Sequence, residues 1–190
     1  MRRRLPVVRA KPEVRQSERD ARQGRRAHVP ASAGGRIDVR ALTPEEVERV
    51  DAALPLSRLD HVQAYLVAWD GDEPVGHAHL AWTGSSLGVP EVQDVFVVES
   101  RRRSGIGTAL MAEAERVAAA EGHGRIGIGH SIDNEAARRL YEGLGYRDAG
   151  LPPARVRGSI MIRGEPIDID DTIVYLVKDL PVDSGPARSS

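Results

Sequence analysis

The chain of 190 residues contains no cysteine. Disulfide bonds, thiolate nucleophiles and cysteine-based zinc sites are therefore excluded. No apolar run approaches the roughly 20 residues of a membrane-spanning helix. The apolar stretch at residues 5–8, after three arginines, is also shorter than the roughly 7–15 residues of a secretory signal core. We therefore expect a cytoplasmic protein that does not contact membranes.

The chain also lacks an excess of either charge, with 27 basic and 28 acidic side chains. The overall balance gives no reason to expect nucleic acid or an anionic membrane as a partner. Residues 1–30 nevertheless hold ten Lys or Arg against three Asp or Glu, and few large apolar side chains. Such a segment cannot bury enough surface to offset the entropy of ordering, so residues 1–36 are expected to form a disordered basic tail and linker.

Aromatic residues make up 4% of the chain, and the basic tail contains none. The tail therefore has no rings on which nucleic-acid bases could stack. This makes a nucleic-acid partner the less favoured interpretation, although an arm for nucleic acid or an acidic protein stays open as an alternative.

The length and a hydrophobic fraction of 41% suit one α/β domain. Alternating or continuous apolar patterns predict strands, and periodic apolar stripes predict helices. The expected strands are residues 37–42, 64–69, 74–82, 91–99, 125–131 and 173–177, with an added hairpin of 159–163 and 167–170. The expected helices begin near residues 43, 104 and 133. The domain should span residues 37–180, followed by a flexible tail at 181–190.

The order of these elements predicts the fold class. Residues 91–99, the long helix after them and residues 125–131 form a right-handed parallel crossover. Residues 64–82 read as an antiparallel hairpin that turns at Asp70-Gly71-Asp72-Glu73. We therefore expect an α/β fold of the α+β type, with a mixed, mostly antiparallel central sheet and flanking helices.

The strongest chemical signal is Arg102-Arg103-Ser104-Gly105-Ile106-Gly107, where the fourth strand meets the long helix. The start of a helix offers unpaired N–H groups and a positive dipole end, and glycine lets a phosphate approach the backbone. The run therefore predicts a diphosphate site. No Walker sequence is present, and Leu110 stands where a dinucleotide motif needs its third glycine, which disfavours both of those ligand classes.

Two motifs together resemble the GNAT family of N-acetyltransferases. Arg102-x-x-Gly105-x-Gly107 resembles the family signature Gln/Arg-x-x-Gly-x-Gly/Ala, and the run from Asn134 through Tyr141 to Tyr146 resembles the helix that follows it in the family. The resemblance extends from residue 37 to 146. It departs at Glu99, where proline is common, and at Arg103, where glycine is common.

The resemblance implies that acetyl-CoA is the co-substrate. It places the pantetheine arm along the fourth strand, the pyrophosphate on the turn, and further contacts on the later helix. The implied cofactor-binding residues are Phe96, Val97, Val98, Arg102, Arg103, Ser104, Gly105, Ile106, Gly107, Thr108, Asn134 and Tyr141.

The resemblance also implies the catalytic groups for direct attack of an amine on the thioester. Tyr141 takes the place of the tyrosine that protonates the departing sulfur, and Asp94 lies where family members carry a base. Each has a structural alternative. Tyr141 also lies on the apolar stripe of its helix, Asn134 has a residue type that caps helices, and Asp94 is equally suited to bonding backbone.

No metal site is predicted. His77 and His79 lie two apart on one strand, but no third ligand can be placed near them. The acceptor is expected to be a small-molecule or peptide amine. The alternatives are a protein N-terminal or lysine acetyltransferase, and a non-catalytic module that binds acetyl-CoA. Residues 43–61 should help form the acceptor pocket, and residues 150–170 are open to a role in that pocket or in a homodimer.

Overall fold

The computed structural model describes residues 36–54, 56, 65–83, 86–162 and 165–181. The basic tail expected before residue 36, most of the tail at 181–190 and residues 57–61 of the expected acceptor region lie outside the described residues. Within the described part of the chain, no helix is long and apolar enough to cross a membrane.

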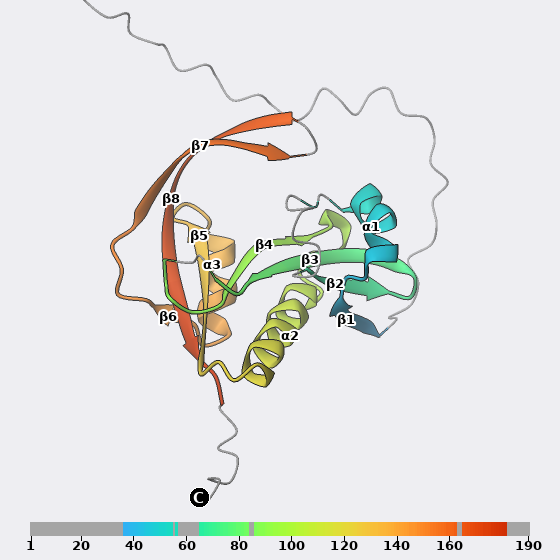
Figure 1. The fold of residues 1–190 in the computed structure, drawn as a ribbon, viewed down its shortest axis with the longest axis horizontal. Coiled ribbons are helices and arrows are strands. Elements are labelled where there is room, and N and C mark those ends of the chain that lie inside the picture. The colour runs from blue at the N-terminus through green and yellow to red at the C-terminus, as the bar shows by residue number, and fades with distance from the viewer. Residues whose placement is uncertain (1–35, 55, 57–64, 84–85, 163–164, 182–190) are drawn as a thin grey trace, which may run out of the picture. The chain divides into compact units, whose positions relative to one another are not determined.

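The chain forms one eight-stranded sheet with helices packed on it (Figure 1). The strands lie in the order β1-β2-β3-β4-β5-β8-β6, and β7 pairs with β8. Only β4 and β5 are parallel among the described pairs, so the predicted mixed sheet and crossover are confirmed. The elements are β1 (Ile37–Ala41), α1 (Val47–Ala53), β2 (Tyr65–Asp70), β3 (Glu73–Ala81), β4 (Glu91–Val97), α2 (Ile106–Ala120), β5 (Arg125–Ser131), α3 (Glu135–Gly143), β6 (Arg147–Asp148), β7 (Ala154–Ile162) and β8 (Glu165–Asp179).

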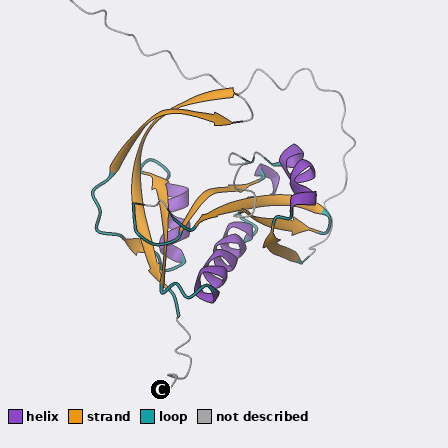
Figure 2. Cartoon of the chain, in the orientation of Figure 1, coloured by secondary structure: helices purple, strands orange, loops and turns teal. Residues whose placement is uncertain are grey.

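Successive side chains of β2 point to opposite faces of the sheet, and both faces are buried. Leu66 and Ala68 belong to the cluster that packs with α2, whereas Tyr65, Val67 and Trp69 belong to a second cluster with α1. Figures 1 and 2 show α1 and α2 on opposite sides of this part of the sheet. Strands β2 to β4 are therefore a central layer with side chains packed on either side.

The late strands differ from the prediction. The sequence predicted separate segments at 167–170 and 173–177, but β8 is one continuous strand of 15 residues. This strand contains an acidic run, Asp168, Asp170 and Asp171. In the structure, Arg155 and Arg157 of β7 both donate to Asp170, and Ser131 donates to Asp171. Because neighbouring strands satisfy these carboxylates, the acidic residues are accommodated without a break in β8.

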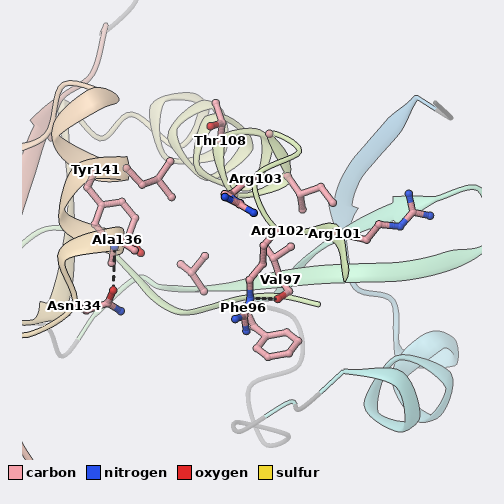
Figure 3. A pocket seen from close by; sticks show the side chains of 15 residues that line it. Phe96, Val97, Arg101, Arg102, Arg103, Thr108, Asn134, Ala136 and Tyr141 are labelled. Atoms are coloured by element: carbon pink, nitrogen blue, oxygen red, sulfur yellow. Dashed lines mark hydrogen bonds between the residues drawn. The ribbon is translucent and has the colours of Figure 1, made fainter. Parts of the chain in front are cut away.

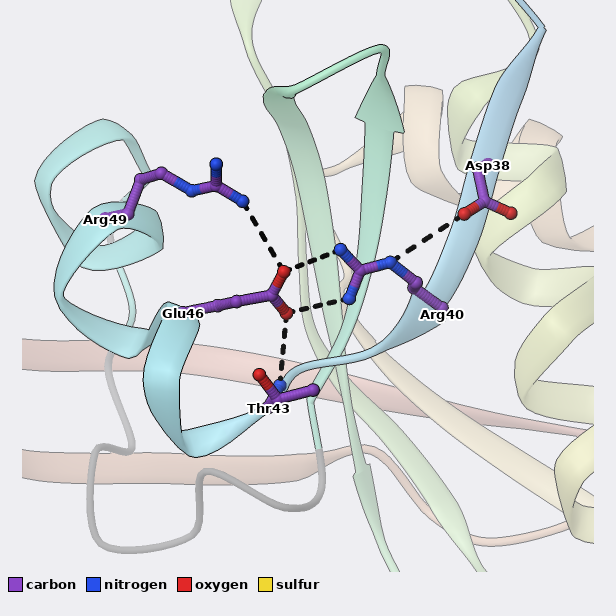
Figure 4. A network of polar contacts seen from close by, with 5 residues as sticks. All are labelled: Asp38, Arg40, Thr43, Glu46 and Arg49. Carbon is purple, nitrogen blue, oxygen red and sulfur yellow. Dashed lines mark hydrogen bonds and ion pairs between the residues drawn. The ribbon is translucent and has the colours of Figure 1, made fainter.

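A polar network joins α1 to β1 (Figure 4). Nη1 and Nη2 of Arg40 donate to the Glu46 carboxylate at 2.7 and 2.6 Å. The Thr43 N–H donates to the same carboxylate at 3.4 Å, as in a capping box. The guanidinium groups of Arg40 and Arg49 lie 4.6 and 4.7 Å from the centre of the Trp69 ring. The network therefore orients α1 against the second core cluster.

The network predicts an acid-sensitive contribution to stability. The hydrogen bonds from Arg40 hold the pKa of Glu46 at about 2, below the ordinary value of 4.5. A lowered folded-state pKa means that the stabilisation is present above pH 4.5 and is lost as the pH falls to about 2. We expect Glu46→Gln to lower the free energy of unfolding by about 1–2 kcal/mol at pH 7. Denaturant unfolding of both proteins from pH 7 to pH 2 measures the difference, which should shrink toward zero. Glu48→Gln, on an exposed side chain of α1, is the control; a constant difference across pH would contradict the prediction.

Candidate active site

Strand β4 contains a bulge at Asp94. The β3–β4 register pairs His77 with Phe96 and His79 with Gln93, so two residues of β4 lie opposite one of β3 between these pairs. Asp94 has a φ of 54°, a left-handed conformation that aspartate tolerates better than most residues. Bulges of this kind bend a strand and redirect its side chains, and they are common beside active sites.

The bulge coincides with the point where β4 leaves β5. The parallel pairing of the two strands consists of Glu91 with Gly127 and Val92 with Ile128. The rest of β4 continues beyond this pairing, and the two strands diverge in Figure 1. In the described pairing, the β5-facing edge of β4 after Val92 therefore has no ladder partner on β5.

The glycine turn starts α2 as predicted, but its two glycines have different roles. Gly105 is the N-cap, with a φ of 85° that only glycine adopts easily. Its carbonyl accepts the Ala109 N–H at 2.9 Å, so the three amides between them are the ones at a helix start without intrahelical acceptors. A Cβ on Gly107 would lie 3.3 Å from Cδ2 of Leu140, so this glycine lets α3 approach α2.

The three arginines before this turn differ in what they contact. Arg101 forms an ion pair with Asp70, whose side chain is 8% exposed. Nε of Arg102 donates to the Val97 carbonyl at 3.2 Å. Arg103 is exposed and has a φ of 62°. This backbone conformation explains why glycine is common at that position, and an arginine held there carries strain on the order of 1–2 kcal/mol.

Helix α3 begins at an asparagine cap. The Oδ1 of Asn134 accepts the Ala137 N–H at 3.0 Å, so Asn134 rather than Asp133 caps the helix. The Asn134 side chain reaches the third residue of the helix, the usual capping geometry, so the capping role given as an alternative for Asn134 is observed.

Tyr141 projects from the same helix into a cluster of rings. Its side chain is 6% exposed, and the rings of His130 and Tyr146 each lie 6.2 Å from it. Burial raises the pKa of Tyr141 to about 12. The phenol therefore keeps its proton at neutral pH.

A cavity of about 590 Å³ lies between β4, the start of α2 and α3 (Figure 3). Figure 3 shows Tyr141, Ala136 and Asn134 of α3 on one side, and Arg102 and Arg103 on the other. The lining residues are Val95, Phe96, Val97, Arg101, Arg102, Arg103, Gly105, Ile106, Gly107, Thr108, Asn134, Ala136, Ala137, Leu140 and Tyr141. The structure thus brings the predicted cofactor-binding residues together around one space, with the exception of Val98 and Ser104.

Those two exceptions are engaged in local structure. The Val98 N–H donates to the Val75 carbonyl at 3.0 Å, and its side chain packs against the core. The Ser104 hydroxyl donates to the Arg101 carbonyl at 2.5 Å. The other lining residues, Val95, Arg101, Ala136, Ala137 and Leu140, were not among the predicted cofactor-binding residues; four of them are apolar and offer no polar group by which to single them out.

Asp94 is exposed and does not line this cavity. Its Oδ2 accepts a hydrogen bond from the Tyr65 hydroxyl at 3.0 Å. His77 and His79 are buried beside this pair, where they pack against aromatic rings. The described residues contain no group of three side chains arranged to hold a metal ion.

Comparisons with known proteins agree with this geometry. The model of the acetyltransferase (GNAT) family matches residues 36–146. The uncharacterized N-acetyltransferase YhfO of Bacillus subtilis is 28% identical over 106 residues, which cover 54% of this chain and 71% of that protein.

Solved structures share the fold at low identity. YncA of Salmonella typhimurium, a putative acetyltransferase solved with its cofactor acetyl-CoA, has a TM-score of 0.54 at 15% identity, over 80% of this chain and 99% of that one. The ribosomal-protein-S18-alanine N-acetyltransferase of Escherichia coli has a TM-score of 0.55 at 14% identity, over 82% and 99%. With a family match over more than half of its residues, the chain belongs to the GNAT family of acetyltransferases.

Proposed function

We propose that this enzyme transfers the acetyl group of acetyl-CoA to a primary amine, with the described cavity as the donor site. The observation that carries the proposal is the convergence of a helix start, two basic side chains and a protonated buried phenol on one space. The presence of acetyl-CoA in the similarly folded YncA supports this choice of donor.

One end of the cavity, at the start of α2, suits the diphosphate of acetyl-CoA, and the other end, at Tyr141, suits its thioester. The free amides at residues 106–108 and the positive dipole end of α2 favour a diphosphate. Arg102 and Arg103 add positive charge there, whereas the charge of Arg101 is matched by Asp70. The diverging edge of β4 borders the path from this end toward Tyr141. A pantetheine arm laid along that edge brings its thioester near the phenol.

The proposed reaction is direct attack. The amine nitrogen bonds to the thioester carbon as the carbon–sulfur bond breaks. Asp94 accepts the proton that the amine loses, through a water where the acceptor requires it, and Tyr141 donates a proton to the departing sulfur. The chain contains no cysteine, so no step uses a protein thiol.

A matched pair of glycine variants tests the donor site. Gly105 and Gly122 have φ angles of 85° and 86°, and a Cβ on either would meet no atom within 4 Å. Alanine at each should therefore cost a similar amount, about 1–2 kcal/mol of unfolding free energy. Of these two glycines, Gly105 lines the cavity and Gly122 does not. We expect Gly105→Ala to weaken acetyl-CoA binding about 10-fold or more in calorimetric titrations, and Gly122→Ala to leave it within about twofold; equal affinities would contradict the assigned site.

A thiol-release assay tests the activity. The enzyme is incubated with acetyl-CoA and a panel of small primary amines, peptides with free N-termini and peptides with internal lysine. We expect thiol release that depends on a small amine or a peptide N-terminus. Release with lysine side chains alone would show that the acceptor is lysine and that the enzyme is a lysine acetyltransferase. Tight acetyl-CoA binding without release for any amine would favour a non-catalytic module and contradict the proposal.

A further inference from the structure

We infer that Tyr65 is a positioning residue for Asp94, and that the enzyme depends on the hydrogen bond between them to orient its base. This inference rests on the proposed role of Asp94 as the base. The contact joins β2 to the bulge of β4, across 29 residues of sequence, with a distance of 3.0 Å from the Tyr65 hydroxyl to Oδ2 of Asp94.

The two partners differ sharply in their freedom. Asp94 is exposed, and the bulge gives its backbone a left-handed conformation. Tyr65 is 0% exposed, and its ring makes edge contacts with His77 and His79 at centroid distances of 5.3 and 5.0 Å. Both histidines are buried. The hydrogen bond therefore ties an exposed carboxylate to a fully buried, closely packed ring.

The same packing connects Asp94 to the donor cavity. The ring of His77 stacks on Phe96 with a centroid distance of 5.6 Å, and Phe96 lines the cavity. Tyr65 thus holds the carboxylate in a fixed relation to the cavity wall.

The chemical consequence is orientation. A base must lie within hydrogen-bond reach of the proton it removes, and holding it there lowers the entropic part of the barrier. Loss of the Tyr65 hydroxyl keeps the base but removes the hydrogen bond that holds its Oδ2. We expect this loss to lower kcat about 10-fold without changing donor binding, because Tyr65 does not line the cavity.

A double-mutant cycle tests the inference with the best amine from the panel. Tyr65→Phe should lower kcat about 10-fold with the KM for acetyl-CoA within about twofold. The same change in an Asp94→Asn background should lower kcat no further, because no base remains to orient. Tyr175→Phe, which removes a hydroxyl from a half-buried tyrosine on β8, is the control and should keep wild-type kcat.

Two results would overturn the inference: wild-type kcat in Tyr65→Phe, or an equal loss from Tyr65→Phe in both backgrounds. Full activity of Asp94→Asn would instead remove the proposed base, a separate failure. If melting shows that Tyr65→Phe does not fold, Asp94→Glu is used as the test instead. This variant keeps a carboxylate but shifts it by one methylene relative to the Tyr65 hydroxyl. The inference then predicts a similar loss of about 10-fold, and wild-type kcat would contradict it.

Discussion

Tyr141→Phe is expected to lower kcat by about 10²–10⁴-fold while acetyl-CoA binds within about twofold of wild type. The substitution removes one hydroxyl and keeps the ring that packs near His130 and Tyr146. Tyr141 lines the cavity and is 6% exposed, so at the proposed donor site its phenol would meet acetyl-CoA with little competing water.

The pH dependence follows from burial. Burial raises the pKa of Tyr141 to about 12, so the proton is present throughout the pH range of an assay. Deprotonation of this residue should therefore cause no fall in rate between pH 7 and pH 10. Initial rates of thiol release against pH measure this directly.

Tyr146→Phe is the matched control for this prediction. Tyr146 is 3% exposed, and its ring lies 6.2 Å from that of Tyr141, but it does not line the cavity. We expect near wild-type kcat for this control. An unchanged kcat in Tyr141→Phe would leave the residue with a packing role only.

Asp94→Asn is expected to lower kcat about 100-fold at neutral pH. Asparagine adopts the left-handed conformation as readily as aspartate, so the bulge should persist. Its side-chain oxygen can still accept the Tyr65 hydroxyl, but an amide cannot take a proton from the amine. The loss should therefore fall on kcat rather than on the KM for acetyl-CoA.

The control is Asp72→Asn, in the exposed turn between β2 and β3. Steady-state kinetics of both variants, together with melting curves, separate a catalytic loss from a folding loss. Wild-type turnover in a folded Asp94→Asn enzyme would exclude the base role.

Most residues around the proposed donor cavity could be named from the sequence because their signals are local. The turn from Arg102 to Gly107 and the helix with Tyr141 each lie in one continuous stretch, and the apolar periodicity assigned the elements around them. The family assignment and the parallel crossover followed from these signals and are confirmed.

The geometry around Asp94 could not be predicted in this way. A polar residue in an apolar run indicated a special position, but the bulge depends on the register of β3 against β4. The partnership with Tyr65 depends on which face of β2 meets that bulge. Likewise, nothing in the local sequence around Arg103 indicates its left-handed backbone, which arises from the turn into α2.

Amide hydrogen exchange with and without acetyl-CoA tests the central claim most directly, because it reports where the donor binds. We expect saturating acetyl-CoA to slow exchange in peptides covering residues 95–97 of β4 and 105–109 at the start of α2, because residues 95–97 and 105–108 line the cavity. Exchange at the far end of α2, residues 116–120, should change little. Binding of acetyl-CoA without slower exchange at residues 105–109 would contradict the account.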